Sequence, residues 1–272
     1  MESGSFGARP RKQLGQHWLK SEAVLGQIVK AAAVSSDASL PQSRLLEIGP
    51  GTGALTRRLL ATSAYVTGVE LDRHLCQKLR QRFQSEPNFQ LIEGDILSLD
   101  LQQIEAQKVV ANIPYYITGP ILERLLGKIS RPNPQPFEAI VLLVQKEVAQ
   151  RICAEPGGRI FGALTVRVQY LAACEWVCEV PAKAFKPPPK VDSAVIKLLP
   201  RPFPVQAHDP AWLETLVKVG FATKRKMLRN NLKSLVERDR LLATYETLGI
   251  KPEVRAEELS VEQWVRLSNQ LG

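Results

Sequence analysis

The sequence predicts an α/β fold, built on a mostly parallel β-sheet with an antiparallel closing pair and followed by a small all-helical C-terminal domain. Three observations lead to this prediction. Short apolar runs alternate with helical patterns between residues 44 and 144, which is typical of a parallel sheet covered on both faces. Two further strand-like runs are separated by a proline-rich loop, and strand signals cease beyond residue 210.

The first element expected is a helix that begins after Ser21, a good N-cap residue, because Val24, Ile28 and Ala31 recur at helical spacing. The region that follows alternates short apolar runs, which predict buried strands, with segments that are apolar on one side, which predict helices. The expected strands cover residues 45–48, 65–69, 89–92, 109–111 and 139–144, and the expected helices cover residues 54–60 and 74–83.

The later part of the chain changes in character. Residues 175–180 and 194–199 predict a closing antiparallel pair of strands. Pro202, Pro204 and Pro210 interrupt the segment that begins at Pro200 and indicate a domain boundary near residue 204. We therefore expect two domains, residues 1–203 and residues 204–272.

Capping signals support the helical character of the second domain. Asp209 followed by Pro210 suits the start of a helix, and Ser260 with Gln263 matches a capping box. At the other end of the chain, residues 1–20 form a basic arm that we expect to be extended and docked.

Composition limits the classes of partner and compartment. The 272 residues carry 36 Lys and Arg against 27 Asp and Glu, a net charge of +9, which favours a polyanionic partner. The longest apolar run, residues 139–144, is far too short to cross a bilayer, and residues 1–11 lack the apolar core of a signal peptide. Four cysteines without CxxC pairing suit a reducing compartment, and three scattered histidines predict no metal site. We expect a cytoplasmic monomer that binds no membrane.

A glycine-rich loop, residues 49–53, lies between the first strand of the predicted sheet and the helix that follows. Such a loop lets the backbone approach a ligand closely, and the start of the helix offers free N–H groups. Glu70 falls at the end of the next strand, where an acid can bind ribose hydroxyls. The loop predicts a nucleotide-like cofactor, and its glycines leave a nicotinamide dinucleotide and S-adenosylmethionine both open.

Two acids favour S-adenosylmethionine. Glu47 precedes Gly49 by two residues, where it can face the ammonium end of this cofactor or organise the loop, and where it would repel a pyrophosphate. Asp95 ends the third strand and suits a hydrogen bond from an adenine amine. Glu47, Glu70, Asp95 and Asn112 all lie at strand ends, so we expect them in one crevice at the carboxyl edge of the sheet.

The tetrapeptide Asn112-Ile113-Pro114-Tyr115 ends the fourth strand and indicates chemistry on the amino group of a nucleobase. The adenine amine is a weak nucleophile because its lone pair is delocalised into the ring, so a catalyst must hold it with acceptors and fix the base. The expected acceptors are the Asn112 side-chain oxygen and the carbonyl of Ile113 or Pro114. Tyr115 is expected to stack on the base, and Phe185 is a candidate for its other face.

A basic segment, residues 221–235, predicts a surface for nucleic acid. It contains no acid and five basic residues, which are Lys224, Arg225, Lys226, Arg229 and Lys233. We expect a helix there whose charges follow a phosphate backbone. A base must leave its stack to enter a slot like that of Asn112 and Tyr115, which favours adenines in RNA loops or single strands over duplex.

Together these motifs resemble the ribosomal RNA small-subunit adenine N6-dimethyltransferases of the KsgA type, which are S-adenosylmethionine enzymes with a Rossmann-like methyltransferase fold. The resemblance covers nearly the whole chain, with the motifs in the family's order and spacing. They are residues 13–19, 47–53, 70–72, 94–97, 112–115 and 185–193. The resemblance implies dimethylation of two adjacent adenines in a 3′-terminal hairpin of small-subunit (16S) ribosomal RNA, within the immature small ribosomal subunit.

Residue roles follow partly from the resemblance and partly from the loop itself. The resemblance implies cofactor contacts from His17, Leu19, Gly49, Glu70, Asp95 and Asn112, to which the loop argument adds Glu47 and Gly51. Asn112, Pro114, Tyr115 and Phe185 are the expected catalytic residues. His17 and Trp18 stand where the family more often has Asn and Phe, and Ile113 replaces Leu. An imidazole has one donor or acceptor per nitrogen, so the contact that His17 makes with the cofactor is open.

Alternatives of other classes stay open. One is an RNA-binding assembly factor with a vestigial slot, against which the presence of Glu70, Asp95, Asn112 and Tyr115 argues. Another is a DNA adenine methyltransferase, which carries a related Asn/Asp-Pro-Pro-Tyr slot, whereas Ile113 stands in its second position here. Two relatives of the family also compete: the erythromycin-resistance methyltransferases, which act on large-subunit RNA, and the mitochondrial transcription factor B proteins, which the early start of the motifs disfavours.

Overall fold

The computed structural model describes residues 16–33 and 43–272, and the chain divides into two compact units. The first unit contains Met1–Arg124, Phe137–Ala149 and Glu175–Leu199, and the second contains Leu125–Pro136, Gln150–Cys174 and Pro200–Gly272. Both units are therefore discontinuous in sequence. The expected division after residue 203 stays a prediction, and the last segment of the second unit begins close to it.

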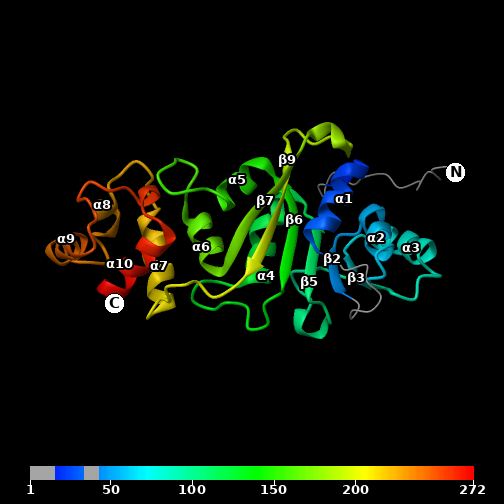
Figure 1. Cartoon of the computed structure of the whole chain (residues 1–272), viewed down its shortest axis with the longest axis horizontal. Helices are drawn as coiled ribbons and strands as arrows, with labels where there is room; N and C mark the ends of the chain where they lie inside the picture. Colours follow the sequence, from blue (N-terminus) through cyan, green and yellow to red (C-terminus); the bar gives the residue numbers. More distant parts are fainter. Residues whose placement is uncertain (1–15, 34–42) are drawn as a thin grey trace. The chain divides into compact units, whose positions relative to one another are not determined.

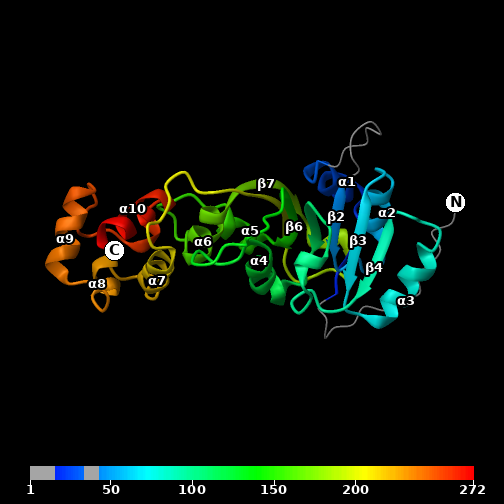
Figure 2. The ribbon, with the colours of Figure 1, turned by 90° about the horizontal axis from the view of Figure 1, so that it is seen from below.

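The first unit is built on a seven-stranded sheet with the order β4-β3-β2-β5-β6-β9-β7, shown in Figures 1 and 2. Its strands are β2 (Arg44–Ile48), β3 (Tyr65–Glu70), β4 (Phe89–Glu93), β5 (Lys108–Asn112), β6 (Ala139–Gln145), β7 (Ala172–Val180) and β9 (Ser193–Pro200). Strands β2 to β6 pair in parallel, and β9 pairs antiparallel with β6. The mostly parallel sheet with its antiparallel closing pair, β9 and β7, is confirmed.

Helices α1 (Glu22–Ala31), α2 (Ala54–Leu60) and α3 (Arg73–Arg82) pack on one face of this sheet through a shared apolar core. Figure 2 shows α4 (Thr118–Leu126) on the opposite side of the strands from α1. The predicted cap of α1 is present, because Ser21 Oγ accepts from Val24 N at 3.4 Å. Sandwiching the sheet in this way leaves its carboxyl edge free for a site.

The described end of the N-terminal arm forms a short strand, β1 (Trp18–Leu19), which pairs antiparallel with β8 (Phe185–Lys186). Lys20 N also donates to Ala184 O at 2.8 Å. Residues 16–20 are therefore docked against the loop between β7 and β9, whereas the expectation for residues 1–15 lies outside the described residues.

The second unit is helical. Its helices are α6 (Ala163–Leu171), α7 (Pro210–Gly220), α8 (Leu228–Leu232), α9 (Arg238–Thr247) and α10 (Val261–Leu271), while α5 (Lys146–Ile152) has residues in both units. The short 3₁₀ helices of the chain are η2 (Leu101–Gln103), η3 (Tyr115–Ile117), η4 (Ala182–Ala184) and η5 (Ala256–Glu258). Asp209 Oδ1 caps α7, and Ser260 with Gln263 forms the predicted capping box of α10.

Close packing holds α7 against α10. Trp264 is fully buried, and a Cβ added at Gly220 would lie 2.4 Å from its ring. Glycine is therefore required where these two helices meet. Within the described residues, no helix is long and apolar enough to span a membrane.

The prediction of a single helix over residues 221–235 is wrong. Residues 221–227 form turns, and only the five residues of α8 are helical. The cause is competition from other backbone partners. Asn231 Nδ2 donates to Gly220 O at 2.6 Å and Thr223 O at 3.1 Å, and Leu228 N donates to Val254 O at 2.8 Å.

Candidate active site

A cleft opens in the first unit at the carboxyl ends of β2, β3, β4 and β5. It encloses about 820 Å³ of space, including the open solvent at its mouth. The strand ends contribute Gly49, Gly51, Glu70, Asp95 and Asn112, and the arm contributes Gln16, His17 and Trp18. The structure thus brings together predicted site residues that are distant in sequence, such as His17 and Asn112, which lie 95 positions apart.

The glycine loop folds through three left-handed residues, since φ is +68° at Gly49, +60° at Gly51 and +76° at Gly53. A Cβ at Gly49 would meet nothing within 4 Å, so this part of the loop borders open space. A Cβ at Gly53 would lie 2.6 Å from the Phe83 ring. The first glycine therefore leaves room for a ligand to approach the backbone, and the third lets the loop pack on α3.

Glu70 joins the glycine loop to the next strand. Its Oε2 accepts from Gly51 N at 3.0 Å, and its Oε1 accepts from Asp72 N at 2.9 Å. Burial raises the pKa of Glu70, and the two backbone N–H groups oppose that rise by stabilising the charge. Each carboxylate oxygen has a further lone pair, so Glu70 can also accept from ligand hydroxyls.

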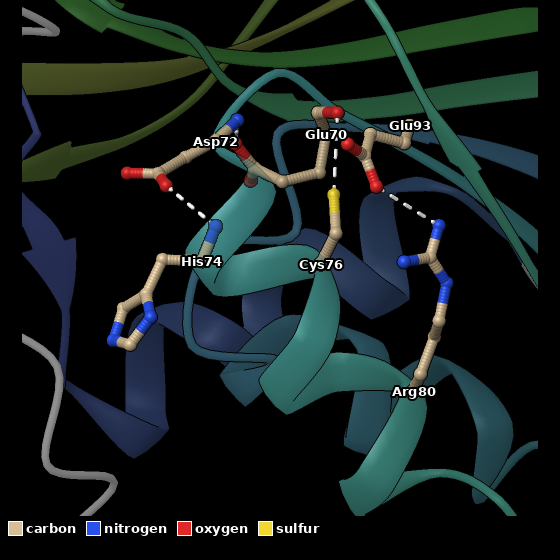
Figure 3. A network of polar contacts seen from close by, with 6 residues as sticks. All are labelled: Glu70, Asp72, His74, Cys76, Arg80 and Glu93. Atoms are coloured by element: carbon tan, nitrogen blue, oxygen red, sulfur yellow. Dashed lines mark hydrogen bonds and ion pairs between the residues drawn. The ribbon is translucent and has the colours of Figure 1, made fainter.

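Figure 3 shows the polar network around Glu70 at the start of α3. Asp72 Oδ1 accepts from His74 N at 3.0 Å as the cap of this helix, and Cys76 Sγ lies 3.5 Å from Glu70 O. Burial raises the pKa of Cys76 to about 11, so its thiol stays protonated near neutral pH. These contacts fix the backbone that carries Glu70, and they leave its side chain facing the loop.

Glu47 is 2% exposed and does not line this cleft. Its Oε2 accepts from Thr56 Oγ1 at 2.6 Å, and burial raises its pKa to about 7. Together with Leu19, it lines a smaller hollow that also borders Gly49 and Asn112. Two roles were expected for Glu47: to face the cofactor or to organise the loop. Its hydrogen bond to Thr56 on α2 favours the second role.

Asp95 lies exposed at the cleft. Its Oδ1 accepts from Leu97 N at 2.9 Å, which orients the carboxylate. The second oxygen remains able to accept from a ligand amine.

Asn112 is oriented by a hydrogen bond to the N-terminal arm. Its Nδ2 donates to His17 O at 3.1 Å, and this bond fixes which way the amide lies. Because the amide nitrogen is engaged, Oδ1 remains as the acceptor for a ligand.

The carbonyls beside Asn112 are not equivalent. Pro114 O accepts from Ile117 N at 3.1 Å and so closes the 3₁₀ helix η3. Ile113 N donates to Leu143 O at 3.2 Å, which anchors the peptide on β6. This arrangement favours Ile113 O over Pro114 O as the second acceptor.

Two aromatic rings face each other beside Asn112. Tyr115 and His17 have ring centroids 6.0 Å apart and planes 19° apart. The Tyr115 hydroxyl lies 2.7 Å from Ser193 Oγ, and the His17 Nδ1–H donates to Pro187 O at 2.9 Å. A base held between two rings needs about 7 Å between them, twice the carbon contact distance, so the His17 ring would have to shift to form the other face.

Phe185, the candidate for that other face, is 4% exposed and belongs to the apolar core of the sheet. It pairs with Leu19 across β1 and β8 and does not line the cleft. Its stacking role stays a prediction that requires the side chain to leave this position.

Sequence reasoning missed several cleft residues. The indole nitrogen of Trp18 is buried without a hydrogen-bond partner in the described part of the chain, and two large apolar residues, Leu71 and Tyr116, are exposed at the cleft. Leu71 directly follows Glu70, and Tyr116 directly follows Tyr115, and both of these preceding residues were predicted as site residues. The position of Leu71 and Tyr116 beside a motif was the signal in the sequence that could have identified them.

Among residues 16–33 and 43–272, no group of three or more His, Cys, Asp or Glu could hold a metal ion.

The family model and the similar proteins of known name agree with each other. The family model described as ribosomal RNA adenine dimethylase matches residues 7–272. Proteins named ribosomal RNA small subunit methyltransferase A from Trichormus variabilis and Nostoc punctiforme are each 57% identical over 97% of this chain, and the matches cover 98% and 96% of their lengths.

Two solved structures share the fold over most of their length. A dimethyladenosine transferase from Plasmodium falciparum has a TM-score of 0.76 and 28% identity, covering 92% of this chain and 96% of its own. The 23S rRNA methyltransferase ErmE has a TM-score of 0.76 and 29% identity, covering 93% and 99%.

Proposed function

Because the chain belongs to the ribosomal RNA adenine dimethylase family, we propose that it dimethylates the N6 amines of adenines in small-subunit (16S) ribosomal RNA. The methyl donor is S-adenosylmethionine. The observation that carries the proposal is the orientation of Asn112, whose amide nitrogen is engaged by His17 O and whose oxygen is left for an amine. The finer target is two adjacent adenines in a 3′-terminal hairpin of the immature small subunit, modified by a cytoplasmic monomer.

The cleft residues fit this donor chemically. Gly49 offers backbone approach, Glu70 offers lone pairs for ribose hydroxyls, and Asp95 offers a carboxylate oxygen for an adenine amine. Gly51 within the loop, together with His17 and Leu19 beside it, completes the proposed cofactor contacts. When bound, S-adenosylmethionine supplies a methyl group that its cationic sulfur has already activated.

The chain's own residues position the amine. Asn112 Oδ1 and Ile113 O accept its hydrogens, which directs the nitrogen lone pair toward the donor and stabilises the positive charge that develops on nitrogen. Tyr115 stacks on the adenine and is held by its bond to Ser193. Pro114 keeps the two acceptors rigid, because its ring fixes the backbone and its carbonyl closes η3.

The second unit supplies affinity for the RNA backbone. Lys224, Arg225 and Lys226 are exposed on a turn that the Asn231 side chain ties to Gly220 and Thr223. Arg229 and Lys233 extend the same basic segment. Five such contacts with single-stranded RNA would give a slope near −3.5 when the logarithm of affinity is plotted against the logarithm of salt concentration, at about 0.7 per contact.

Incubation with methyl-labelled S-adenosylmethionine and immature small subunits tests the proposal. The expected product is N6,N6-dimethyladenosine in the small-subunit RNA, identified and located by mass spectrometry. Tight binding without label would instead favour an RNA-binding assembly factor. Equal transfer to large-subunit RNA or to duplex DNA would overturn the choice of substrate.

A further inference from the structure

Tyr116 presents its side chain to solvent at the mouth of the cleft. It is 61% exposed, the most exposed of the large hydrophobic residues in the described part of the chain. It also lines the cleft, directly after Tyr115. An aromatic side chain held in water at the entrance of a ligand site marks a place for a partner with a flat apolar face.

The backbone holds this ring in a fixed place. Tyr116 is the middle residue of η3, whose turn is closed by Ile117 N to Pro114 O at 3.1 Å. Thr118 Oγ1 donates to Tyr115 O at 3.2 Å and continues the turn into α4. The backbone that carries the Tyr116 side chain is already ordered, so a ligand that binds the ring has little backbone entropy to remove.

The geometry of η3 separates the tasks of its two tyrosines. Successive residues of a 3₁₀ helix point about 120° apart, so Tyr115 and Tyr116 cannot cover the same base. Tyr115 is half-buried and bonded to Ser193, whereas Tyr116 is at the rim. The ring of Tyr116 therefore meets whatever lies next to the base that occupies the slot.

We propose that Tyr116 is a stacking platform for the nucleotide adjacent to the target adenine. The proposal rests on the proposed function, because a base that leaves the RNA stack to reach Asn112 brings its neighbours to the rim of the cleft. Those neighbours have lost a stacking partner, and an exposed tyrosine ring can replace it. Leu71, the other exposed apolar residue at the cleft, has no ring and cannot act in this way.

The test measures the affinity of the protein for a synthetic RNA hairpin from the 3′ end of the small-subunit RNA, alongside methyl transfer to immature subunits. Tyr116→Ala should weaken RNA binding about 5- to 150-fold, the range expected for one stacked base. Tyr116→Phe should bind within about twofold of the unchanged protein, because the ring is retained. Trp176→Ala is the matched control, since Trp176 is an exposed aromatic on β7 and does not line the cleft.

Abasic RNAs make the test specific for stacking. The nucleotide on the 5′ or the 3′ side of the target is replaced by an abasic one, and both proteins are compared on each RNA. On one of the two RNAs, Tyr116→Ala should bind as well as the unchanged protein, because no base remains to stack. A loss of equal size on all RNAs would overturn the proposal, and so would a rise in the KM for S-adenosylmethionine with RNA binding unchanged.

The experiments distinguish failure of the proposed function from failure of the role of Tyr116. If the unchanged protein transfers no methyl group, the proposed function fails, while the binding comparison still decides the role of Tyr116. If methyl transfer occurs and no abasic RNA removes the difference between the two proteins, only the role of Tyr116 fails.

Discussion

The cleft of the first unit and the basic segment of the second unit use polar side chains in opposite ways. In the cleft, Asn112 and Glu70 are each held by backbone partners, at 3.1 Å from His17 O and 3.0 Å from Gly51 N. In the basic segment, Lys224, Arg225 and Lys226 are exposed, and none of them pairs with a carboxylate in the described residues. Oriented groups can select one atom of a ligand, whereas unpaired charges attract any phosphate backbone. This contrast leads us to propose that the rate of methyl transfer depends mainly on the cleft, and that the salt-dependent part of RNA affinity depends mainly on the basic segment.

Asn112→Ala should have the largest effect, because it removes an oriented acceptor. We expect kcat for methyl transfer to fall by about 10²- to 10³-fold, which is the range for loss of one preorganised hydrogen-bonding group. RNA affinity should change less than about threefold, since the basic segment is intact. Single-turnover transfer and equilibrium binding of RNA measure the two quantities, and a loss of binding in proportion to rate would break the division of tasks.

Glu47→Gln tests how much burial of an acid beside the loop affects stability. The pKa of Glu47 is raised from 4.5 to about 7 in the folded chain, so the folded state binds more protons than the unfolded state between these pH values. The free energy of unfolding therefore falls by about 3 kcal/mol as the pH rises from 4.5 through 7. The amide can still accept from Thr56 and does not ionise.

Urea unfolding at pH 5 and at pH 8 measures this difference. The unchanged protein should lose about 3 kcal/mol more than Glu47→Gln between the two pH values. Acids other than the neighbouring Glu70, whose charge acts on Glu47, contribute equally to both proteins and cancel in the comparison. Parallel pH dependences would show that Glu47 is not buried as an acid with a raised pKa.

Glu70→Ala should mainly weaken cofactor binding. Loss of hydrogen bonds to a charged acceptor corresponds to about a 10- to 100-fold rise in the KM for S-adenosylmethionine, with a smaller change in kcat. Because Glu70 also holds Gly51 N, Glu70→Gln serves as the control that keeps one acceptor for the loop. Small and equal effects of Glu70→Ala and Asn112→Ala on transfer would contradict the assigned roles.

Replacing Lys224, Arg225 and Lys226 together by Gln should have the smallest effect on catalysis. The salt slope of RNA binding should become shallower by about 2, at about 0.7 per phosphate contact. At saturating RNA, kcat should stay within about twofold. Affinity measured between 50 and 200 mM salt gives the slope, and an unchanged slope would remove this turn from the RNA surface.

Periodicity and strand-end position predicted most of the fold and the outline of the site. Parallel strands end at one edge, so Glu70, Asp95 and Asn112 could be placed in one crevice without knowledge of the structure. The mostly parallel sheet followed from the alternation of strands and helices, whereas its Rossmann-like class came from the family resemblance. These features depend on local patterns, which a sequence contains directly.

The remaining features depend on contacts between distant residues. The bond from Asn112 to His17 O spans 95 positions and requires the arm to pair with β8. That same pairing buries Phe185, which the motif alone placed beside the base. The turn over residues 221–227 replaces a helix because Asn231 and Val254 supply other hydrogen bonds. Tertiary partners of this kind override local propensity.

A crystal structure of the protein with adenosine and the demethylated form of the cofactor tests the central claim most directly. The account predicts that the adenosine N6 lies about 2.7 to 3.2 Å from both Asn112 Oδ1 and Ile113 O, with Asn112 Nδ2 still bonded to His17 O. An Asn112 side chain that releases His17 and turns Nδ2 toward the base would contradict it. An amine that lies out of reach of both oxygens would contradict it equally.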